Sequence, residues 1–443
     1  MSSNWGNLIR ISIFGESHGA GVGVVIDGLP AGEPIDLEEL QVNMSRRAPG
    51  HDRTATPRKE SDIPEILSGT LEGRTTGAPL CALIRNTNTR SADYQNLSIL
   101  PRPGHSDYPA YVKYQGYNDI RGGGHFSGRL TSPLVFAGSV CRQILRRRGI
   151  EIGAHIYAIA GIPDDPFDPV HVDAPLLSQL SHSRFSLINP AVEEPMRAAV
   201  EQARMSLDSV GGIVECAAVG VPAGLGSPMF GGVENVFSSL IFGIPAIKGV
   251  EFGEGFGAAK MRGSQHNDPY RIENGAVKTV TNHAGGILGG ITSGMPILVR
   301  AVVKPTSSIS QRQDTVDLTT RENTILEVHG RHDPCIVPRA VPVVESATLE
   351  ETRGEIAQID GQLLSLFTRR MDCARKVAQV KARQNLPVLN AGREQEILDR
   401  VGREAGCYEG AAKILFATLM DVSRALQHEA LGGGDSLRQL IDA

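Results

Sequence analysis

The pattern of hydrophobic and polar positions divides the chain into two parts. In the first 350 residues, short apolar runs of strand length alternate with glycine-rich turns, as at residues 21–26, 213–219 and 297–303. Apolar residues with helical spacing occur at residues 130–148 and 195–208. This alternation predicts a mixed α/β body that is rich in loops.

The residues after position 350 follow a different pattern. Apolar side chains recur with the 3.6-residue period of a helix over residues 356–380. Pro387 interrupts this pattern, and further helices are predicted at residues 394–403 and 408–431. A first helix of this length predicts that a partner chain packs along it.

Composition changes at the same point. Of 26 prolines only Pro387 lies after residue 350, and of 12 histidines only His428 does. A chain of 443 residues has room for two or three domains of about 150 residues. We therefore predict two domains, residues 1–349 and residues 350–443.

Charge and cysteine usage exclude several classes of protein. With 41% apolar residues, 21% charged residues and a net charge of −5, the chain is neither disordered nor a basic nucleic-acid binder. No apolar run reaches the ~18–20 residues of a membrane span, and the first residues lack a secretory pattern. Six scattered cysteines without a CxxC pair indicate a reducing cytosol and no zinc site. We expect a cytoplasmic protein with small-molecule partners, no metal, no nucleic acid and no membrane.

The body contains short clusters that mix glycine, arginine, histidine and serine. Glycine lets backbone N–H groups approach an anion, arginine supplies a planar fork for phosphate or carboxylate, and histidine exchanges protons near neutral pH. Each cluster alone could be an ordinary turn or a solvated charge pair, and none is a GxSxG elbow or a Walker A loop. Together they predict a site for a substrate that carries phosphate and carboxylate groups. The clusters lie at residues 15–19, 46–53, 102–107, 121–125, 304–308 and 331–334.

Eight ordered motifs over residues 8–347 resemble chorismate synthase: GESHG, SRRAPG, RPGHSDY, RGGG, GVPAGLGSP, TNHAGGILGG, KPTSS and GRHDPC. The resemblance implies a β-α-β sandwich with antiparallel sheets. It also implies a trans-1,4-elimination of phosphate from 5-enolpyruvylshikimate-3-phosphate that gives chorismate and needs reduced FMN. NADPH would be a further cofactor only if the chain reduces its own flavin. The sequence departs from the family pattern where His125 and Phe126 replace an Arg-Ser pair and where Pro245 replaces asparagine.

The same resemblance assigns roles to residues of the body. His18 would protonate the reduced flavin side, His105 would assist the departing phosphate, and Asp333 would act as base through a flavin nitrogen. The anion clamp would consist of Arg47, Arg53, Arg102 and Arg129. The flavin-contacting residues would be His125, Phe126, Ser127, Ala246, Gly289, Lys304, Pro305, Thr306, Ser307, Ser308 and Arg331.

The helical tail allows two interpretations. Its apolar stripe alone is typical of a non-catalytic oligomerisation or regulatory module attached to an active body. However, Arg370 and Lys381 are 11 residues apart and share a helix face, as do Ser423 and Gln427, which are four apart. Cations and hydrogen-bonding groups that face one helix-lined space would suit a small dicarboxylate.

The tail resembles the all-helical class of chorismate mutase over residues 350–430. The resemblance implies a three-helix unit intertwined with its dimer mate, which rearranges chorismate to prephenate without a cofactor. Lys381 and Gln427 would hydrogen-bond the ether oxygen, and Arg370 would bind a carboxylate together with Arg353 from the partner chain. The remaining contacts would be Asn390 through its backbone, Arg393 at the enolpyruvyl group, Glu394 at the hydroxyl and Ser423 at a carboxylate.

The two resemblances fit each other, because the product of the body is the substrate of the tail. We therefore predict a bifunctional enzyme of the α+β class, with a β-α-β sandwich body and an all-α three-helix domain. We expect a homotetramer with a mutase-domain dimer interface. The main alternative is an active synthase with a non-catalytic tail; another is a flavin-binding body that lacks the elimination chemistry.

Overall fold

A computed structural model describes residues 3–50, 60–88, 96–328, 333–383, 387, 391–405 and 409–430. It divides into two compact units, Met1–Ala357 and Gln358–Ala443. Among the described residues, no helix is both long enough and apolar enough to cross a membrane.

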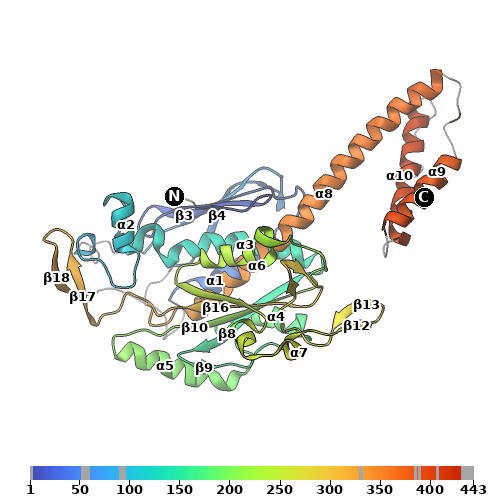
Figure 1. The fold of residues 1–443 in the computed structure, drawn as a ribbon. Coiled ribbons are helices and arrows are strands. Elements are labelled where there is room, and N and C mark those ends of the chain that lie inside the picture. Colours follow the sequence, from blue (N-terminus) through green and yellow to red (C-terminus); the bar gives the residue numbers. More distant parts are fainter. Residues whose placement is uncertain are drawn as a thin grey trace. The chain divides into compact units, whose positions relative to one another are not determined.

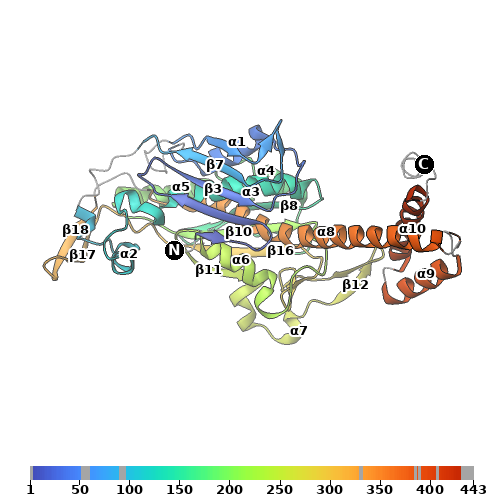
Figure 2. The same ribbon diagram turned by 90° about the horizontal axis from the view of Figure 1, so that it is seen from above.

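The first sheet has five antiparallel strands, and β3 and β7 run side by side in it (Figure 2). Alternate residues of β3 point into the core, where Val22, Val24 and Ile26 are fully buried. The strand predicted at residues 21–26 is confirmed as β3. In spatial order the strands are β1 (Asn4–Trp5), β2 (Arg10–Gly15), β3 (Gly21–Asp27), β7 (Leu80–Arg85) and β4 (Pro64–Ser68).

The second sheet also has five antiparallel strands, and it includes both strands predicted at residues 213–219 and 297–303. Along β8, Ile152, Ala154 and Ile156 are buried on one face, and the side chain of His155 lies on the other. In spatial order the strands are β11 (Ile247–Phe252), β16 (Ile297–Val303), β10 (Gly212–Val219), β8 (Glu151–Ile159) and β9 (Ile162–Pro163).

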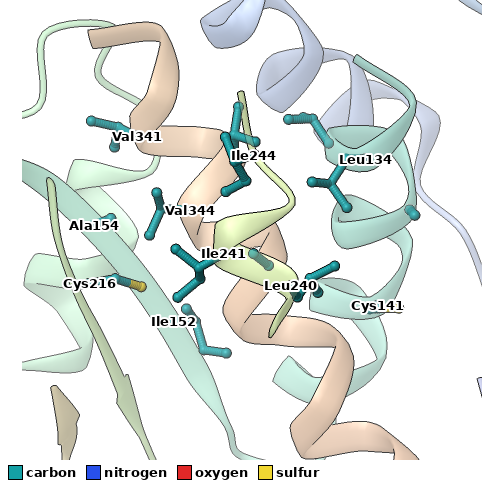
Figure 3. Close-up of a cluster of buried hydrophobic side chains, with 14 of the residues drawn as sticks. Leu134, Cys141, Ile152, Ala154, Cys216, Leu240, Ile241, Ile244, Val341 and Val344 are labelled. Atoms are coloured by element: carbon teal, nitrogen blue, oxygen red, sulfur yellow. The ribbon is translucent and has the colours of Figure 1, made fainter. Parts of the chain in front are cut away.

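A helical layer lies between the two sheets and makes the β-α-β sandwich (Figure 1). It contains α3 (Thr131–Arg146), α6 (Val233–Phe242) and the first turns of α8 (Val337–Arg383). Apolar side chains from these helices pack against β8 and β10, where Ile241 and Val344 face Ile152 and Cys216 (Figure 3). The predicted fold class of the body is therefore confirmed.

Further helices cover the sandwich or border the loops. Helix α1 packs on α3, and its N-terminus is capped by Asp36, whose side chain accepts from the backbone N–H groups of Glu38 and Glu39. Helix α4 packs on the outer face of the second sheet, where Leu177 lies directly over Gly153. Their bounds are α1 Leu37–Arg47, α2 Asp107–Tyr114, α4 Ala174–Leu180, α5 Glu193–Met205 and α7 Gly263–His266.

Four two-stranded hairpins extend from the body. Each of them carries at least one exposed apolar side chain, as at Leu71, Ile272, Leu288 and Ile325. The hairpins are β5 Thr70–Leu71 with β6 Arg74–Thr75, β12 Tyr270–Glu273 with β13 Ala276–Thr279, β14 Ile287–Leu288 with β15 Ile291–Thr292, and β17 Arg312–Asp317 with β18 Glu322–Glu327.

The second unit is helical, as predicted. It contains the later turns of α8 together with α9 (Ala391–Ala405) and α10 (Glu409–Ala430), which pack against each other. Helix α8 continues without a break through residue 350, where the sequence analysis set the end of the first domain. The residues around that point are polar, but glutamate and arginine are good helix formers, so polarity alone does not end the helix.

Candidate active sites

The first unit contains a cavity of about 520 Å³, within the range of about 300–1,000 Å³ that is usual for small-molecule sites. Its wall combines segments far apart in sequence, from the end of α1 to the first turns of α8. The cavity brings together most of the predicted site residues of the body. Those that line it are Arg47, Arg102, His105, His125, Phe126, Ser127, Arg129, Ala246, Lys304, Thr306, Ser307, Ser308 and Asp333.

Five predicted residues of the body are not among the lining residues. His18 is half-buried beside Gly122, which does line the cavity. Gly289 lies in the turn that joins β14 to β15, and Pro305 lies between two lining residues. Arg53 and Arg331 lie outside the described residues.

Three consecutive glycines border the cavity, and their backbone conformation requires glycine. Gly122, Gly123 and Gly124 have φ angles of 61°, 85° and 55°, a region that other residues rarely adopt. A Cβ atom on Gly122 would lie 2.5 Å from Cδ2 of His18, and one on Gly123 would lie 3.4 Å from Nε2 of His105. The missing side chains therefore let one backbone segment pass close to both predicted catalytic histidines.

His105 belongs to a buried cluster at the start of α2. The Arg102 guanidinium donates to both oxygens of Asp107, at 2.7 and 2.8 Å, and to Oγ of Ser308 at 3.0 Å. His105 Nδ1 lies 2.6 Å from Asp107 Oδ1. Because a carboxylate only accepts, Nδ1 carries the proton and donates, which leaves Nε2 on the side of Gly123.

The histidine and the aspartate of this cluster both have shifted pKa values. Burial lowers the pKa of His105; the hydrogen bond to Asp107 works against this, and the cations Arg102 and Lys304 reinforce it. Burial alone would raise the pKa of Asp107, but the hydrogen bonds from Arg102 and His105 outweigh it and hold that pKa well below its usual range. The lowered pKa of His105 therefore favours the neutral ring at neutral pH.

Two further arginines of the cavity wall share one buried carboxylate. Arg47 and Arg129 each donate to a different oxygen of Asp62. Burial lowers the pKa of Arg47 to about 9, and the charge of Asp62 works against this shift. The Arg47 guanidinium therefore depends on Asp62 for its charge balance.

Asp333 lies just before α8, far from Arg47 in the sequence, and is paired with a cation from that helix. Arg339 Nη1 donates to Asp333 Oδ2, and Arg339 Nε donates to the backbone oxygen of Arg47 at 2.9 Å. Both Asp333 and Arg339 line the cavity. The candidate base and the candidate anion clamp are thus joined through one guanidinium.

The segment after β16 supplies groups that could hold a phosphate-bearing cofactor. Thr306 Oγ1 is buried at the cavity and has no hydrogen-bond partner within the described part of the chain. Lys304 lies beside it and donates to the backbone oxygen of Gly104 at 3.0 Å. Burial lowers the pKa of Lys304, and the nearby charge of Lys248 adds to the effect. An orphaned hydroxyl beside two lysines fits an anionic group of a bound ligand.

His125, which stands where the family pattern has arginine, has protein partners for both ring nitrogens. Nδ1 lies 2.8 Å from the backbone oxygen of Gly15, and Nε2 lies 2.7 Å from Oγ of Ser3. Nδ1 must donate, because a carbonyl oxygen only accepts. His125 therefore ties the glycine segment to the end of β2, and Ser17 N–H adds a second bond to the backbone oxygen of Gly124 at 3.1 Å.

In the second unit, predicted residues from α8 and α10 meet. Arg370 donates to Oγ of Ser423 and, at 2.8 Å, to the backbone oxygen of Leu419. Burial lowers the pKa of Arg370. Gln427 is 8% exposed, and its Oε1 has no hydrogen-bond partner within the described residues. A half-buried cation with neutral partners, on a unit that also buries an unsatisfied amide oxygen, is typical of a binding site rather than of a closed helix core.

Three other predicted residues of the tail lie on α8 and α9. Lys381 is half-buried on α8. Glu394 pairs with Arg424 of α10 at 2.8 Å, and Arg393 is exposed and pairs with Glu396 at 2.8 Å. Asn390 and the side chain of Arg353 lie outside the described residues.

Four residues that the sequence analysis did not single out hold the site residues in place. Asp107 was the easiest to find, because it lies inside a quoted motif two residues after His105. Arg339 had a weaker signal, a lone cation at the start of an apolar helix. Asp62 and Arg424 gave no signal, since their partners are distant in sequence or on another helix.

Comparison with protein families gives two matches that together cover most of the chain. The family model described as chorismate synthase matches residues 9–351. The model described as chorismate mutase type II matches residues 352–428. The two matches adjoin at residues 351 and 352, within helix α8.

Individual proteins similar to this chain match its body. A chorismate synthase from Dehalococcoides mccartyi is 47% identical over 348 residues, which are 79% of this chain and 94% of that protein. One from Thermococcus kodakarensis is 49% identical over 342 residues, which are 77% of this chain and 94% of that protein. A crystal structure of a chorismate synthase has a TM-score of 0.63 and 27% identity, and covers 80% of this chain and 92% of that one.

Proposed function

Because the chain belongs to the chorismate synthase family and continues into a chorismate mutase type II domain, we propose that it catalyses two successive reactions. The body eliminates phosphate from 5-enolpyruvylshikimate-3-phosphate to give chorismate. The tail rearranges chorismate to prephenate. The observation that carries the first half is the cavity in which His105 and Asp333 face the same space as four arginines.

In the elimination, an allylic C–O bond breaks, phosphate leaves, a ring proton is lost and a new C=C bond forms. Arg47, Arg129 and Arg102 bind the anionic groups of the substrate and balance the charge of the departing phosphate. The bound anion favours the protonated form of His105, which then donates the proton of Nε2 to that phosphate. Asp333 takes the proton lost from the ring, which balances the proton that His105 gives to phosphate. His18, beside Gly122, would hold a proton on the reduced flavin side and takes no part in this balance. These roles rest on the positions of the residues at the cavity and on the family's motifs.

Reduced FMN is the cofactor that we assign to the body. When bound, it supplies electron density that helps to expel the phosphate. Thr306, with its unsatisfied hydroxyl, and Lys304 are the described residues best suited to hold its anionic part, together with the neighbouring Ser307 and Ser308. His125 lines the same cavity, and both its ring nitrogens have protein partners, so it holds the wall in place rather than offering a free ring nitrogen to the cofactor.

In the rearrangement, one C–O bond breaks and one C–C bond forms, with no net transfer of protons. Catalysis therefore requires a cage that holds the compact conformer and stabilises charge on the ether oxygen. Arg370 and Ser423 bind a carboxylate, Lys381 and the Gln427 amide donate to the ether oxygen, and Glu394 accepts from the hydroxyl. The buried, unsatisfied Gln427 oxygen argues against a tail that serves only for assembly, because native helix cores rarely leave such groups unpaired.

We further propose a cytoplasmic homotetramer in which the tails pair as dimers. Five cysteines of the described chain are free thiols, as is usual in a reducing compartment. Large apolar side chains are exposed on the body, including Tyr117, Phe230 and Phe256, and exposed apolar surface is typical of subunit interfaces. In the paired tail, Arg353 would reach the site of the partner subunit.

The two half-reactions can be measured separately on the whole chain. Under anaerobic conditions with photoreduced FMN, 5-enolpyruvylshikimate-3-phosphate should release stoichiometric phosphate. Chorismate alone, without flavin, should be converted to prephenate. Phosphate release without chorismate consumption would identify the tail as an assembly module, and binding of FMN without phosphate release would reduce the body to a flavin-binding module.

A further inference from the structure

The carboxylate of Asp62 lies behind the cavity wall rather than in it. The Asp62 side chain is fully buried and is not among the lining residues, whereas its two partners Arg47 and Arg129 both line the cavity. Asp62 Oδ2 accepts from Arg47 and Asp62 Oδ1 from Arg129. One carboxylate therefore fixes the orientation of two cavity-facing guanidinium groups that come from α1 and η3 (Gly128–Leu130).

From this arrangement we infer that Asp62 is a positioning residue that orients the arginines of the anion-binding wall. Asn86 in turn links one of these arginines to the loop that carries His18. The inference rests on the proposed function of the body, because it explains how the substrate-binding arginines are held. Neither residue is assigned a contact with substrate or with reacting atoms.

The count of charges supports a role in anion binding. Within the described wall, Arg102 is matched by Asp107 and Arg339 by Asp333, each pair with no net charge. Asp62 faces two guanidinium groups, so this buried group of three side chains carries one positive charge that its own carboxylate does not balance. Lys304 and Lys248 add further positive charge to the same wall. An uncompensated buried charge is costly, and an anion in the cavity reduces that cost.

The backbone of Asp62 is held in an unusual conformation. Its φ angle is 49°, in the left-handed region, which aspartate tolerates better than most residues but which still costs free energy. The preceding Glu60 is buried and accepts from the Thr87 hydroxyl at 2.7 Å and from the backbone N–H groups of Thr87 and Asn88 at 3.2 Å each. These bonds fix the loop against the end of β7, where the Asp62 carboxylate reaches both arginines.

Asn86 continues the connection from the same place. Its Oδ1 accepts from Arg129 Nε at 2.9 Å, and its Nδ2 donates to the backbone oxygens of Glu16 and Gly19, each at 2.9 Å. These two carbonyls flank His18 in the sequence. A single amide therefore couples the orientation of an anion-binding arginine to the loop of a predicted catalytic histidine.

The first test replaces Asp62 by asparagine and measures two quantities. An amide presents an N–H group to one of the two guanidinium groups, so only one of the two arginines still finds an acceptor there. We expect KM for 5-enolpyruvylshikimate-3-phosphate to rise about 30-fold or more, as is usual when a buried charge pair loses one partner. Inorganic phosphate, titrated into the whole chain without flavin or substrate, should bind correspondingly more weakly. Asp27→Asn is the matched control, because Asp27 pairs with Arg10 at the surface.

The second test replaces Asn86 by alanine. Asn86 is only half-buried in a loop, so this variant should fold. We expect kcat to fall while the affinity for inorganic phosphate stays within about twofold of the wild type, because the His18 loop is released but Asp62 still holds both arginines. A merely structural role would not separate kcat from affinity in this way.

The outcomes distinguish the inference from the function on which it rests. A folded Asp62→Asn chain with wild-type KM and wild-type phosphate affinity would overturn the inference. If that variant does not fold, Asn86→Ala decides: a lower kcat with retained affinity supports the inference, and unchanged kcat overturns it. A wild-type chain that releases no phosphate from substrate would instead refute the proposed function, and the phosphate titrations would still decide the role of Asp62.

Discussion

The two candidate sites both use arginine to bind anions, but they neutralise it differently. In the body, Arg47 and Arg102 are held by the buried carboxylates Asp62 and Asp107, and His105 shares the second of these. In the tail, the described hydrogen bonds of Arg370 go to a serine hydroxyl and a backbone oxygen. The two arginines of the body therefore lie among titratable groups, whereas Arg370 in the tail lies among neutral ones.

This difference matches the chemistry that each site is proposed to perform. An elimination must move protons, and the carboxylates and histidines of the body can hold or release them near neutral pH. A pericyclic rearrangement moves no proton, so a site of fixed donors is sufficient and has little pH dependence of its own. The comparison predicts that one site will be sensitive to changes in its titratable groups and that the other will be sensitive to loss of its fixed donors.

The largest expected effect comes from His105→Asn. Loss of the proton donor should lower kcat for phosphate release by about 10²–10⁴-fold, the usual range for a general acid or base. Conversion of added chorismate to prephenate should not change. His182→Asn is the control, since His182 is exposed and hydrogen-bonds only locally, to the backbone oxygen of Ser178. Wild-type phosphate release by His105→Asn would remove His105 from the mechanism.

The corresponding change in the tail is Lys381→Ala. Removing one fixed donor to the ether oxygen should lower the mutase rate by about 10²–10³-fold and leave phosphate release unchanged. Lys376→Ala provides a matched control on an exposed position of the same helix. Equal loss of both activities in Lys381→Ala would mean that the two reactions share a site.

A third prediction concerns stability rather than rate. His155 is fully buried between Asp164 at 2.8 Å and Glu215 at 3.0 Å. Burial disfavours its charged form, but hydrogen bonds to the two carboxylates outweigh burial and raise the pKa of His155. His155→Gln should therefore lower the free energy of unfolding by about 3–5 kcal/mol at pH 6, as measured by denaturant titration.

The pH dependence of that difference has a definite sign. A raised pKa in the folded state stabilises the protein fully below the unfolded pKa of about 6.5, and this stabilisation is lost as the pH rises through the folded value. The difference in the free energy of unfolding between wild type and His155→Gln should therefore become smaller above pH 7. His171→Gln, at an exposed position, should show no such trend; a gap that widens with pH would contradict a charged His155.

The smallest expected effect is that of Arg424→Gln in the tail. Arg424 pairs with Glu394 at 2.8 Å, and both side chains are partly exposed. Such a pair contributes about 0.5–1 kcal/mol, so we expect KM for chorismate to rise about two- to fivefold as Glu394 loses its orientation. Arg403→Gln on α9 is the exposed control. A lower KM in Arg424→Gln would mean that Arg424 competes with the substrate for Glu394.

Sequence reasoning found what is local and missed what depends on the fold. Arg102 and His105 were predicted because their motif is contiguous and their shared partner lies within five residues of both. Asp62 was not, because it is 67 residues from Arg129 and only the arrangement of loops brings them together. Apolar runs predicted one strand of the first sheet, β3, and two of the second, β10 and β16, since strands in a core bury apolar side chains.

The connection between the two parts shows a second limit. The boundary between residues 349 and 350 was predicted from the change in composition and periodicity, and it stays a prediction; α8 passes through it as one helix of 47 residues. Polarity marks where a helix leaves an apolar core, not where the helix ends, and no proline interrupts it there. A change in environment can therefore be predicted from such a segment, but a break in secondary structure cannot.

The central claim is that the body makes what the tail consumes, and one measurement tests it most directly. The whole chain is incubated anaerobically with 5-enolpyruvylshikimate-3-phosphate and reduced FMN, and the end product is identified by chromatography. The account predicts prephenate from the wild type and chorismate from Lys381→Ala. Accumulation of chorismate by the wild type, with no prephenate, would contradict it.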